Sequence, residues 1–248
     1  MKPERILPML PIVPDWPAPR GVRALASSRA GGVSVAAYGG LNLATHVGDD
    51  PEAVADNRRQ LACLLPAEPL WLSQVHGTRV QAAEDYTPGV NADACVARSP
   101  GQVCAVLCAD CLPVLFCDDG GTVVGAAHAG WRGLAAGVLE ATVAAMEVAP
   151  GRLMAWFGPA IAQPAFEVGA EVRAAFVGHD PRAAGAFLAE GNGKWRCDLT
   201  ALARLRLAAA GVTRLYGGGL CTFSDPRRFY SHRRDGVTGR MASLIWLA

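Results

Sequence analysis

The order of apolar and polar positions along the chain predicts a mixture of strands and helices. Short apolar runs bounded by glycine, proline or charge predict strands, and apolar residues spaced three or four apart predict helices. The runs predict strands at 22–28, 71–75, 92–97, 122–127, 153–157, 214–216 and 241–247, with two apolar runs inside 103–116. The spacing predicts helices at 50–65, after Gly133, across 168–176 and at 199–210. Because strands and helices alternate only loosely, we expect a mixed sheet and not a strict parallel barrel.

The helix at 50–65 carries polar residues where apolar ones are expected. Asp50 followed by Pro51 is a helix start, because an N-cap acceptor precedes proline at the first helical position. Asn57 and Arg58 lie three and four residues after Val54, on the apolar stripe. This pair either forms a buried polar network or faces a binding site.

Composition narrows the class of protein. Of the 248 residues 51% are hydrophobic and 18% charged, so most of the chain can fold around a core. The net charge of +1 argues against nucleic acid as a partner. The eight cysteines stand in a long chain, five of them between 95 and 117 inside apolar runs, which does not resemble a disulfide framework. We therefore expect reduced thiols and a cytoplasmic location.

The N-terminus is expected to form an arm. Residues 1–21 are rich in proline, and we predict an extended segment with Trp16 against the body of the protein. Its prolines and Glu4 interrupt the apolar run that a secretory signal needs. Elsewhere glycine or charge interrupts every apolar stretch before the roughly 18 residues of a membrane helix. No membrane association is expected.

Two histidines and one cysteine are placed at the ends of predicted strands. His76 precedes Gly77, His128 follows an apolar run, and Cys111 interrupts another run beside an aspartate. One thiolate with two imidazoles is a ligand set for an open zinc site, but the spacings are long, and a single histidine is more often a hydrogen-bonded structural residue than a metal ligand. The Cys108–Cys111 pair invites a redox interpretation, which we discount because residues three apart face opposite sides of a regular strand.

Two segments are candidate anion sites. Residues 130–133, Gly-Trp-Arg-Gly, precede a predicted helix whose first N–H groups lack intrahelical partners. Residues 231–236 and Arg240 cluster several guanidinium groups. This second segment is either a solvated basic turn or a clamp for phosphate or carboxylate.

These motifs together resemble the laccase-domain family, whose members are also called multicopper polyphenol oxidoreductase, purine nucleoside phosphorylase or peptidoglycan editing factor. The resemblance extends from Trp16 to Leu247. The segments that carry it are GGVS, LNLATHVGDDPEAVADNRRQL, QVHG, ADCLPVLF, AAHAGWRGLAAGVL, FGPAI, EVGAEV and FYSHRRDGVTGR. His232 stands where tyrosine is usual, and Cys108 stands where threonine is common.

The resemblance implies an α+β fold: one domain over residues 22–248, with a central mixed β-sandwich flanked by helices. It implies a metal site, usually zinc, of His76, Cys111 and His128, and so demotes His46, His179 and His232. Arg58 joins these three ligands as a catalytic candidate. The expected substrate-binding residues are Asn42, Asn57, Gln74, Asp110, Arg132, Ser231, Arg233 and Arg234.

Among the activities associated with the family, purine nucleoside phosphorylase is favoured. Similar enzymes cleave adenosine, inosine and methylthioadenosine with phosphate, and some deaminate adenosine. A multicopper oxidase needs many imidazoles in H-x-H pairs, whereas this chain has five histidines and no such pair, so copper could bind only outside a multicopper cluster. We expect a monomer or weak homodimer that binds a purine nucleoside and phosphate.

Three alternatives remain from the sequence. Cys111 as nucleophile with His128 as base would make a hydrolase, but only if the thiolate is not bound to zinc. Editing of a peptidoglycan precursor would make the protein a cytosolic amidase. A binding protein without enzymatic activity is the third.

Overall fold

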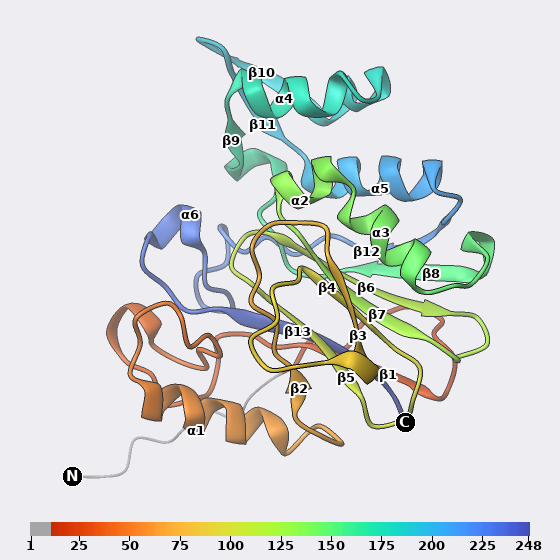
Figure 1. Cartoon of the computed structure of the whole chain (residues 1–248). Helices are drawn as coiled ribbons and strands as arrows, with labels where there is room; N and C mark the ends of the chain where they lie inside the picture. Colours follow the sequence, from red (N-terminus) through yellow and green to blue (C-terminus); the bar gives the residue numbers. More distant parts are fainter. Residues whose placement is uncertain (1–10) are drawn as a thin grey trace.

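Two β-sheets packed face to face form the centre of the protein, in a computed structural model that describes residues 11–248 (Figure 1). The first has four strands in the order β1 (Val22–Ala26), β13 (Met241–Leu247), β5 (Val103–Cys108), β2 (Pro69–Leu70). The second has six in the order β12 (Arg214–Gly217), β8 (Leu153–Phe157), β6 (Leu112–Asp118), β7 (Val124–Ala129), β4 (Ala94–Ala97), β3 (Val80–Ala82). Both sheets are mixed, because β2–β5, β3–β4 and β8–β12 are parallel and the other pairs antiparallel.

Helices cover the outer faces of this sandwich. They are α1 (Pro51–Ala62), α2 (Trp131–Ala136), α3 (Val138–Ala145), α4 (Ala170–Val177), α5 (Leu199–Ala209) and the short α6 (His232–Asp235). Five 3-10 turns lie at Ala36–Tyr38, Ala83–Asp85, Pro150–Arg152, Gln163–Ala165 and Pro181–Ala186. A small third sheet, β10 (Phe187–Gly191), β11 (Lys194–Cys197) and β9 (Glu167–Val168), lies with α4 beyond α2 and α5 (Figure 1). The predicted α+β fold with a mixed sandwich flanked by helices is confirmed.

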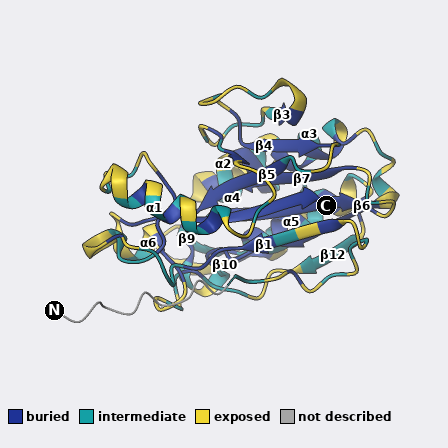
Figure 2. Ribbon diagram, turned by 90° about the horizontal axis from the view of Figure 1, so that it is seen from below, coloured by how far each residue is buried: buried dark blue, intermediate teal, exposed yellow. Residues whose placement is uncertain are grey.

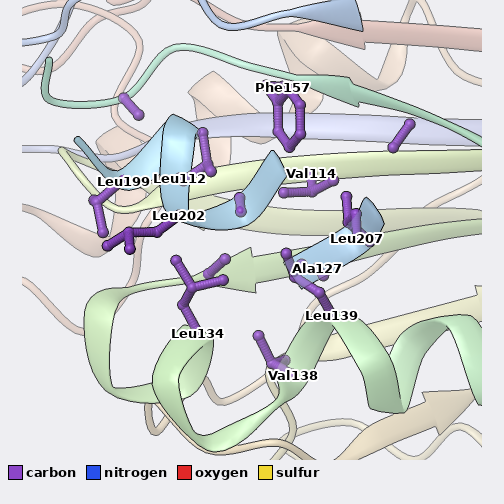
Figure 3. Packing of buried hydrophobic residues seen from close by; sticks show 14 of the residues in the cluster. Leu112, Val114, Ala127, Leu134, Val138, Leu139, Phe157, Leu199, Leu202 and Leu207 are labelled. Carbon is purple, nitrogen blue, oxygen red and sulfur yellow. The ribbon is translucent and has the colours of Figure 1, made fainter. Parts of the chain in front are cut away.

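Most residues of the central strands are buried, as the dark strands of Figure 2 show. Because successive side chains of a strand point to opposite faces, these strands bury side chains on both faces of their sheet. On β6, Leu115 and Cys117 pack between the two sheets, whereas Val114 and Phe116 pack under the helices. Figure 3 shows this outer core, in which side chains of α2, α3 and α5 meet those of β6, β7 and β8. The other outer face, that of β5 and β13, is covered by Leu61 of α1 together with residues 41–44.

Most predicted elements are found, with shifted ends. Asp50 caps α1 by accepting a hydrogen bond from the Glu52 amide, as predicted. The predicted strand 71–75 is wrong: β2 ends at Leu70, and Ser73 makes only an isolated bridge to Asn91. The helix expected after Gly133 begins at Trp131 and is broken at Gly137, whose φ of 103° ends α2 and starts α3.

The described part of the N-terminal segment lies against the body of the protein. Ile12 pairs with Ala26, and Trp16 packs on the core between the sheets, as expected for Trp16. Residues 1–10 of the predicted arm lie outside the described part. Within residues 11–248, the helices are all too short or too polar to cross a bilayer.

Candidate functional site

Cys111 lies in the tight turn between β5 and β6. Asp110, before it, has a φ of 91°, a left-handed conformation that is unusual for a residue with a side chain. Its carboxylate accepts hydrogen bonds from Thr222 Oγ1 and from the Arg233 amide, both at 2.6 Å. These two bonds tie the strained turn to the C-terminal part of the chain, so Asp110 positions the thiol of Cys111.

The sequence suggested that His128 follows the strand, but the residue lies inside β7 and is almost fully buried. Its Nδ1 is 2.9 Å from Asp93 Oδ1. Because a carboxylate accepts, Nδ1 donates this hydrogen bond and Nε2 faces the site, the arrangement found behind metal-binding histidines.

Asp93 also positions His76. Its carboxylate accepts hydrogen bonds from the amides of Val75, His76 and Gly77 at 2.7–3.1 Å. These bonds hold the loop in which His76 has a φ of 61°. Burial alone would raise the pKa of Asp93, but these hydrogen bonds, with that of His128 the largest among them, keep the pKa below its ordinary value. One buried carboxylate therefore orients two candidate ligands.

His76, Cys111 and His128 converge as their sequence context predicted. Their ligand atoms lie within 4.8 Å of one another, and Cys111 Sγ is 3.7 Å from His76 Nε2. Ordinary zinc bond lengths with tetrahedral angles place a sulfur and a nitrogen ligand about 3.6 Å apart. Gly130 leaves the space beside them, since a Cβ there would meet His76 Cδ2 at 2.8 Å and Cys111 Sγ at 3.0 Å. The donor set fits zinc, and the separation of Cys111 Sγ from His76 Nε2 is already close to that of two ligands of one ion.

The two titrating groups of the site favour metal binding through the thiolate. Burial alone would raise the pKa of Cys111, but His128 and then His76 beside it lower the pKa to about 6. Burial alone would lower the pKa of His128, but Cys111 and Asp93 raise it to about 9. At neutral pH Cys111 is therefore a thiolate, the form of cysteine that binds metals, whereas His128 is protonated and must give up its Nε2 proton when a metal binds.

The three candidate ligands open into a cavity of about 330 Å³. Gln74 and Arg132, two of the residues expected to bind substrate, line it. Gln74 also bridges to β5, because its amide exchanges two hydrogen bonds with the backbone of Leu107. The other lining residues are His46, Leu107, Cys108, Ala109, His232 and Arg240. Cys108 and Cys111 both reach this cavity because a turn, and not a regular strand, joins them.

A smaller cavity of about 130 Å³ adjoins the first and shares Ala109, Cys111 and His232 with it. Asp110 and Arg233, two further residues expected to bind substrate, line this second space. The other lining residues are Trp131, Ile161, Phe166 and Leu199.

Asn57 and Arg58 of α1 line neither cavity. Asn57 is fully buried and bonds to Ser34 Oγ and to backbone groups at 33, 40 and 42, so the polar-network alternative is correct. Arg58 donates to the Leu43 carbonyl at 2.9 Å and stacks 4.1 Å above the Trp71 ring. The expectation that both point into the cleft is wrong.

Three other expected substrate contacts are used within the fold. Asn42 is fully buried and bonds to Asp49, to Ala44 and to the Arg240 amide. Ser231 caps α6 by accepting from the Arg234 amide. Arg234 donates to three carbonyls and pairs with Asp235. These side chains hold the loops around the cavity.

Four residues of the site escaped the sequence reasoning or were demoted by it. Asp93 was not singled out, although a carboxylate at the start of a buried strand must find partners. His46 and His232 were set aside because the resemblance selects other ligands, yet both line the cavity. Arg240 was noted only as part of a basic cluster.

Comparison with known proteins gives the family. The family described as multi-copper polyphenol oxidoreductase laccase matches residues 23–248. The chain belongs to this family. It is 55% identical over 237 residues to a purine nucleoside phosphorylase of Pseudomonas aeruginosa, covering 95% of this chain and 98% of that protein. It is 53% identical over 240 residues to the purine nucleoside phosphorylase YfiH of Escherichia coli, with coverage of 95% and 98%.

Solved structures have the same fold. The crystal structure of a Neisseria meningitidis protein matches with a TM-score of 0.93 and 53% identity, over 97% of this chain and 99% of that one. The protein YlmD of Geobacillus stearothermophilus matches with a TM-score of 0.84 and 32% identity, over 92% of each chain. The family description thus carries the laccase name and the similar proteins carry the phosphorylase name, and the chemistry of the site has to distinguish between them.

Proposed function

We propose that the protein is a purine nucleoside phosphorylase and that the reaction takes place in the 330 Å³ cavity. The observation that carries this proposal is the combination, in one cavity, of the His76–Cys111–His128 ligand set with two cations, Arg132 and Arg240. The names of the relatives support the same reaction. Adenosine, inosine and methylthioadenosine are the proposed substrates, with adenosine deamination as a second activity.

Arg132 and Arg240 are the groups proposed to hold phosphate. Within the described part of the chain no acceptor is bonded to the Arg132 guanidinium, which rests only on the Trp131 ring at 4.4 Å. Arg240 uses Nη1 on the carbonyls of Thr238 and Gly239, which leaves its other donors for a ligand. Arg58 and Arg234, which the sequence also suggested as residues of the site, donate to backbone carbonyls elsewhere.

The reaction breaks the bond between ribose C1′ and the base nitrogen and forms a bond between C1′ and a phosphate oxygen. The base leaves with the electron pair and takes a proton. Positive charge builds up on the sugar as the bond breaks, so a phosphate fixed by two guanidinium groups stabilises the transition state as well as attacking it. A zinc ion held by three protein ligands would supply a Lewis acid with one open coordination position.

The geometry does not support laccase chemistry. Residues 11–248 bring together one group of three metal-ligating side chains. A multicopper oxidase needs a copper cluster as well as a separate copper centre, and a single Cys-His-His set cannot hold both.

Product analysis tests the proposal. Purified, zinc-loaded protein is incubated with adenosine or inosine, with and without inorganic phosphate. We expect ribose-1-phosphate to form only with phosphate, and Arg240→Gln to raise the KM for phosphate by about tenfold or more, the scale of a lost charge-assisted hydrogen bond. Arg234→Gln is not a usable control, because it removes the hydrogen bonds that hold the C-terminal loop. The control is Arg59→Gln, which changes an exposed arginine of α1.

Two results would contradict the proposal. Free ribose formed at the same rate without phosphate means hydrolysis. If the protein turns over no nucleoside, the alternatives of a cytosolic amidase or a Cys111–His128 hydrolase are favoured.

A further inference from the structure

The 130 Å³ cavity beside the metal site differs in chemistry from the cavity that it joins. Its walls are largely apolar, with Phe166, Ile161 and Leu199 contributing from the core beneath α5 and Trp131 from the start of α2. The larger cavity is lined instead by histidines, arginines and Gln74. A ligand that enters both would place an apolar part in one and a polar part in the other.

Both carboxylate oxygens of Asp110 in the small cavity accept hydrogen bonds, from Thr222 and from the Arg233 amide. The Arg233 guanidinium donates through Nη1 to the Glu167 carbonyl at 2.8 Å and lies 5.1 Å from the centre of the Phe166 ring. The Asp110 carboxylate offsets the charge of Arg233, so this wall carries no excess positive charge for phosphate, and the remaining lining side chains are apolar or aromatic. The cavity therefore suits a flat, weakly polar group.

Aromatic rings and guanidinium planes are the surfaces on which nucleic-acid bases stack in proteins. Phe166, Arg233 and Trp131 supply such surfaces here. The two cavities meet at Cys111, Ala109 and His232. His232 is fixed at this junction, because its Nδ1 donates to the Gly236 carbonyl at 2.6 Å.

From this arrangement we infer that the apolar cavity is the subsite for the purine base, with the glycosidic bond at the Cys111–His232 junction and the ribose and phosphate in the larger cavity. The inference rests on the proposed function for the identity of the ligand. It adds an orientation: the base lies away from Arg132 and Arg240, and Phe166 and Ile161 determine how tightly it is held.

Binding of free adenine tests the inference without any turnover. Adenine is titrated by calorimetry into zinc-loaded wild type, Phe166→Leu and Ile161→Phe, the last of which fills the cavity. The control is Phe176→Leu, the same change at a buried phenylalanine of the same core that lines neither cavity. We expect Phe166→Leu to weaken adenine binding by about tenfold, the scale of one stacking contact, Ile161→Phe to abolish it, and Phe176→Leu to leave it unchanged.

Inorganic phosphate titrated into the same variants should bind as it does to wild type. Three results would overturn the inference: no adenine binding to the wild type, adenine affinity unchanged in folded Phe166→Leu and Ile161→Phe, or a loss of phosphate affinity in place of adenine affinity. If the pocket variants weaken methylthioadenosine but not adenine, the cavity holds the 5′ substituent and the inference also fails.

Failure of the inference and failure of the proposed function give different results. Adenine binding that depends on Phe166, without phosphorolysis of any nucleoside, contradicts the function and leaves the base subsite standing. Phosphorolysis with adenine affinity unaffected by both pocket variants contradicts the subsite alone.

Discussion

Asp93 is fully buried, and its hydrogen bonds hold two of the three candidate ligands, His128 and His76, in place. It accepts from His128 Nδ1 and from the three amides around His76. A group of this kind raises the basicity of one ligand and fixes the position of the other, so its effect appears in metal affinity.

We expect Asp93→Asn to lower zinc affinity by about 10–100-fold, the range found when such supporting groups are removed. The amide keeps the shape of the carboxylate but places a donor against backbone N–H groups. The measurement is competition for zinc with a chelator of known affinity. Asp118→Asn is the control, because Asp118 is equally buried but lies at the end of β6, where its carboxylate binds the following turn. An equal loss of zinc affinity in both variants would contradict the role assigned to Asp93.

For single residues, the sequence pointed to the candidate metal ligands more reliably than to the residues that hold the surrounding loops. His76, Cys111 and His128 are chemically distinctive and few, so context and resemblance sufficed to select them. Asn42, Asn57 and Arg234 were misassigned because buried polar residues that hold loops look the same in a sequence as residues that bind a substrate. Only the hydrogen-bond partners distinguish the two roles.

At the scale of elements, the break between β7 and α2 at Gly130 brings backbone against two candidate metal ligands, His76 and Cys111. Gly130 has an ordinary φ of −63°, so the need for glycine comes from space and not from conformation. Gly137, which separates α2 from α3, has the opposite character: its φ is 103°, and a Cβ there meets nothing closer than 3.6 Å.

These two glycines make a matched pair of variants. Gly130→Ala should lower zinc affinity by about tenfold or more, because its methyl displaces His76 and Cys111. Gly137→Ala should cost about 1–2 kcal/mol of stability through its left-handed backbone and leave zinc affinity unchanged. Chelator competition and urea denaturation of both variants check this, and normal zinc binding by Gly130→Ala would show that the site has more room than the structure indicates.

The turn between β6 and β7 is held by the buried carboxylate of Asp118. Burial alone would raise its pKa, but the amides of Val123, Thr122 and Gly120 and the Thr122 hydroxyl hold the pKa below its ordinary value. The folded state therefore binds this proton less readily than the unfolded state. The stabilisation is complete above the unfolded pKa of about 3.9 and is lost as the pH falls through the lower folded pKa.

We expect Asp118→Asn to reduce the free energy of unfolding at pH 7 by about 1–3 kcal/mol. The difference from wild type should shrink as the pH falls from about 5 to 2, because the wild-type carboxylate becomes protonated there. Urea denaturation at a series of pH values measures this. A difference that stays constant down to pH 2 would mean that the carboxylate charge contributes nothing.

For the whole molecule, the candidate ligands join distant segments: Cys111 is 35 residues after His76 and 17 before His128, and the turn that carries it is tied to Thr222 and Arg233. The unfolded chain cannot bring these groups together, so a bound metal stabilises the folded state only.

Saturating zinc, at about 100 times its dissociation constant, should stabilise the protein by about 3 kcal/mol and raise the melting temperature by about 5–10 °C. Cys111→Ser should remove most of this shift, whereas the exposed Cys63→Ser should keep it. Scanning calorimetry with zinc and with chelator gives the comparison. An equal shift in both variants would place the zinc elsewhere.

The α+β class and most of the long strands could be predicted, because a doubly buried strand such as β6 or β13 leaves a nearly continuous apolar run. The small sheet of β9, β10 and β11 escaped prediction because its strands are short and β10 is mostly exposed. The pairing order of the strands was also out of reach, since it depends on contacts between the two ends of the chain.

That pairing order has a consequence for biosynthesis. β13, which follows β1 and β5 in the chain, lies between these two strands and pairs with both over most of its length. Until β13 has been synthesised, β1 and β5 each expose an unpaired edge, and the inner face of the neighbouring sheet lacks part of its cover. The nascent chain must therefore keep two apolar strands apart from other chains until β13 can insert between them.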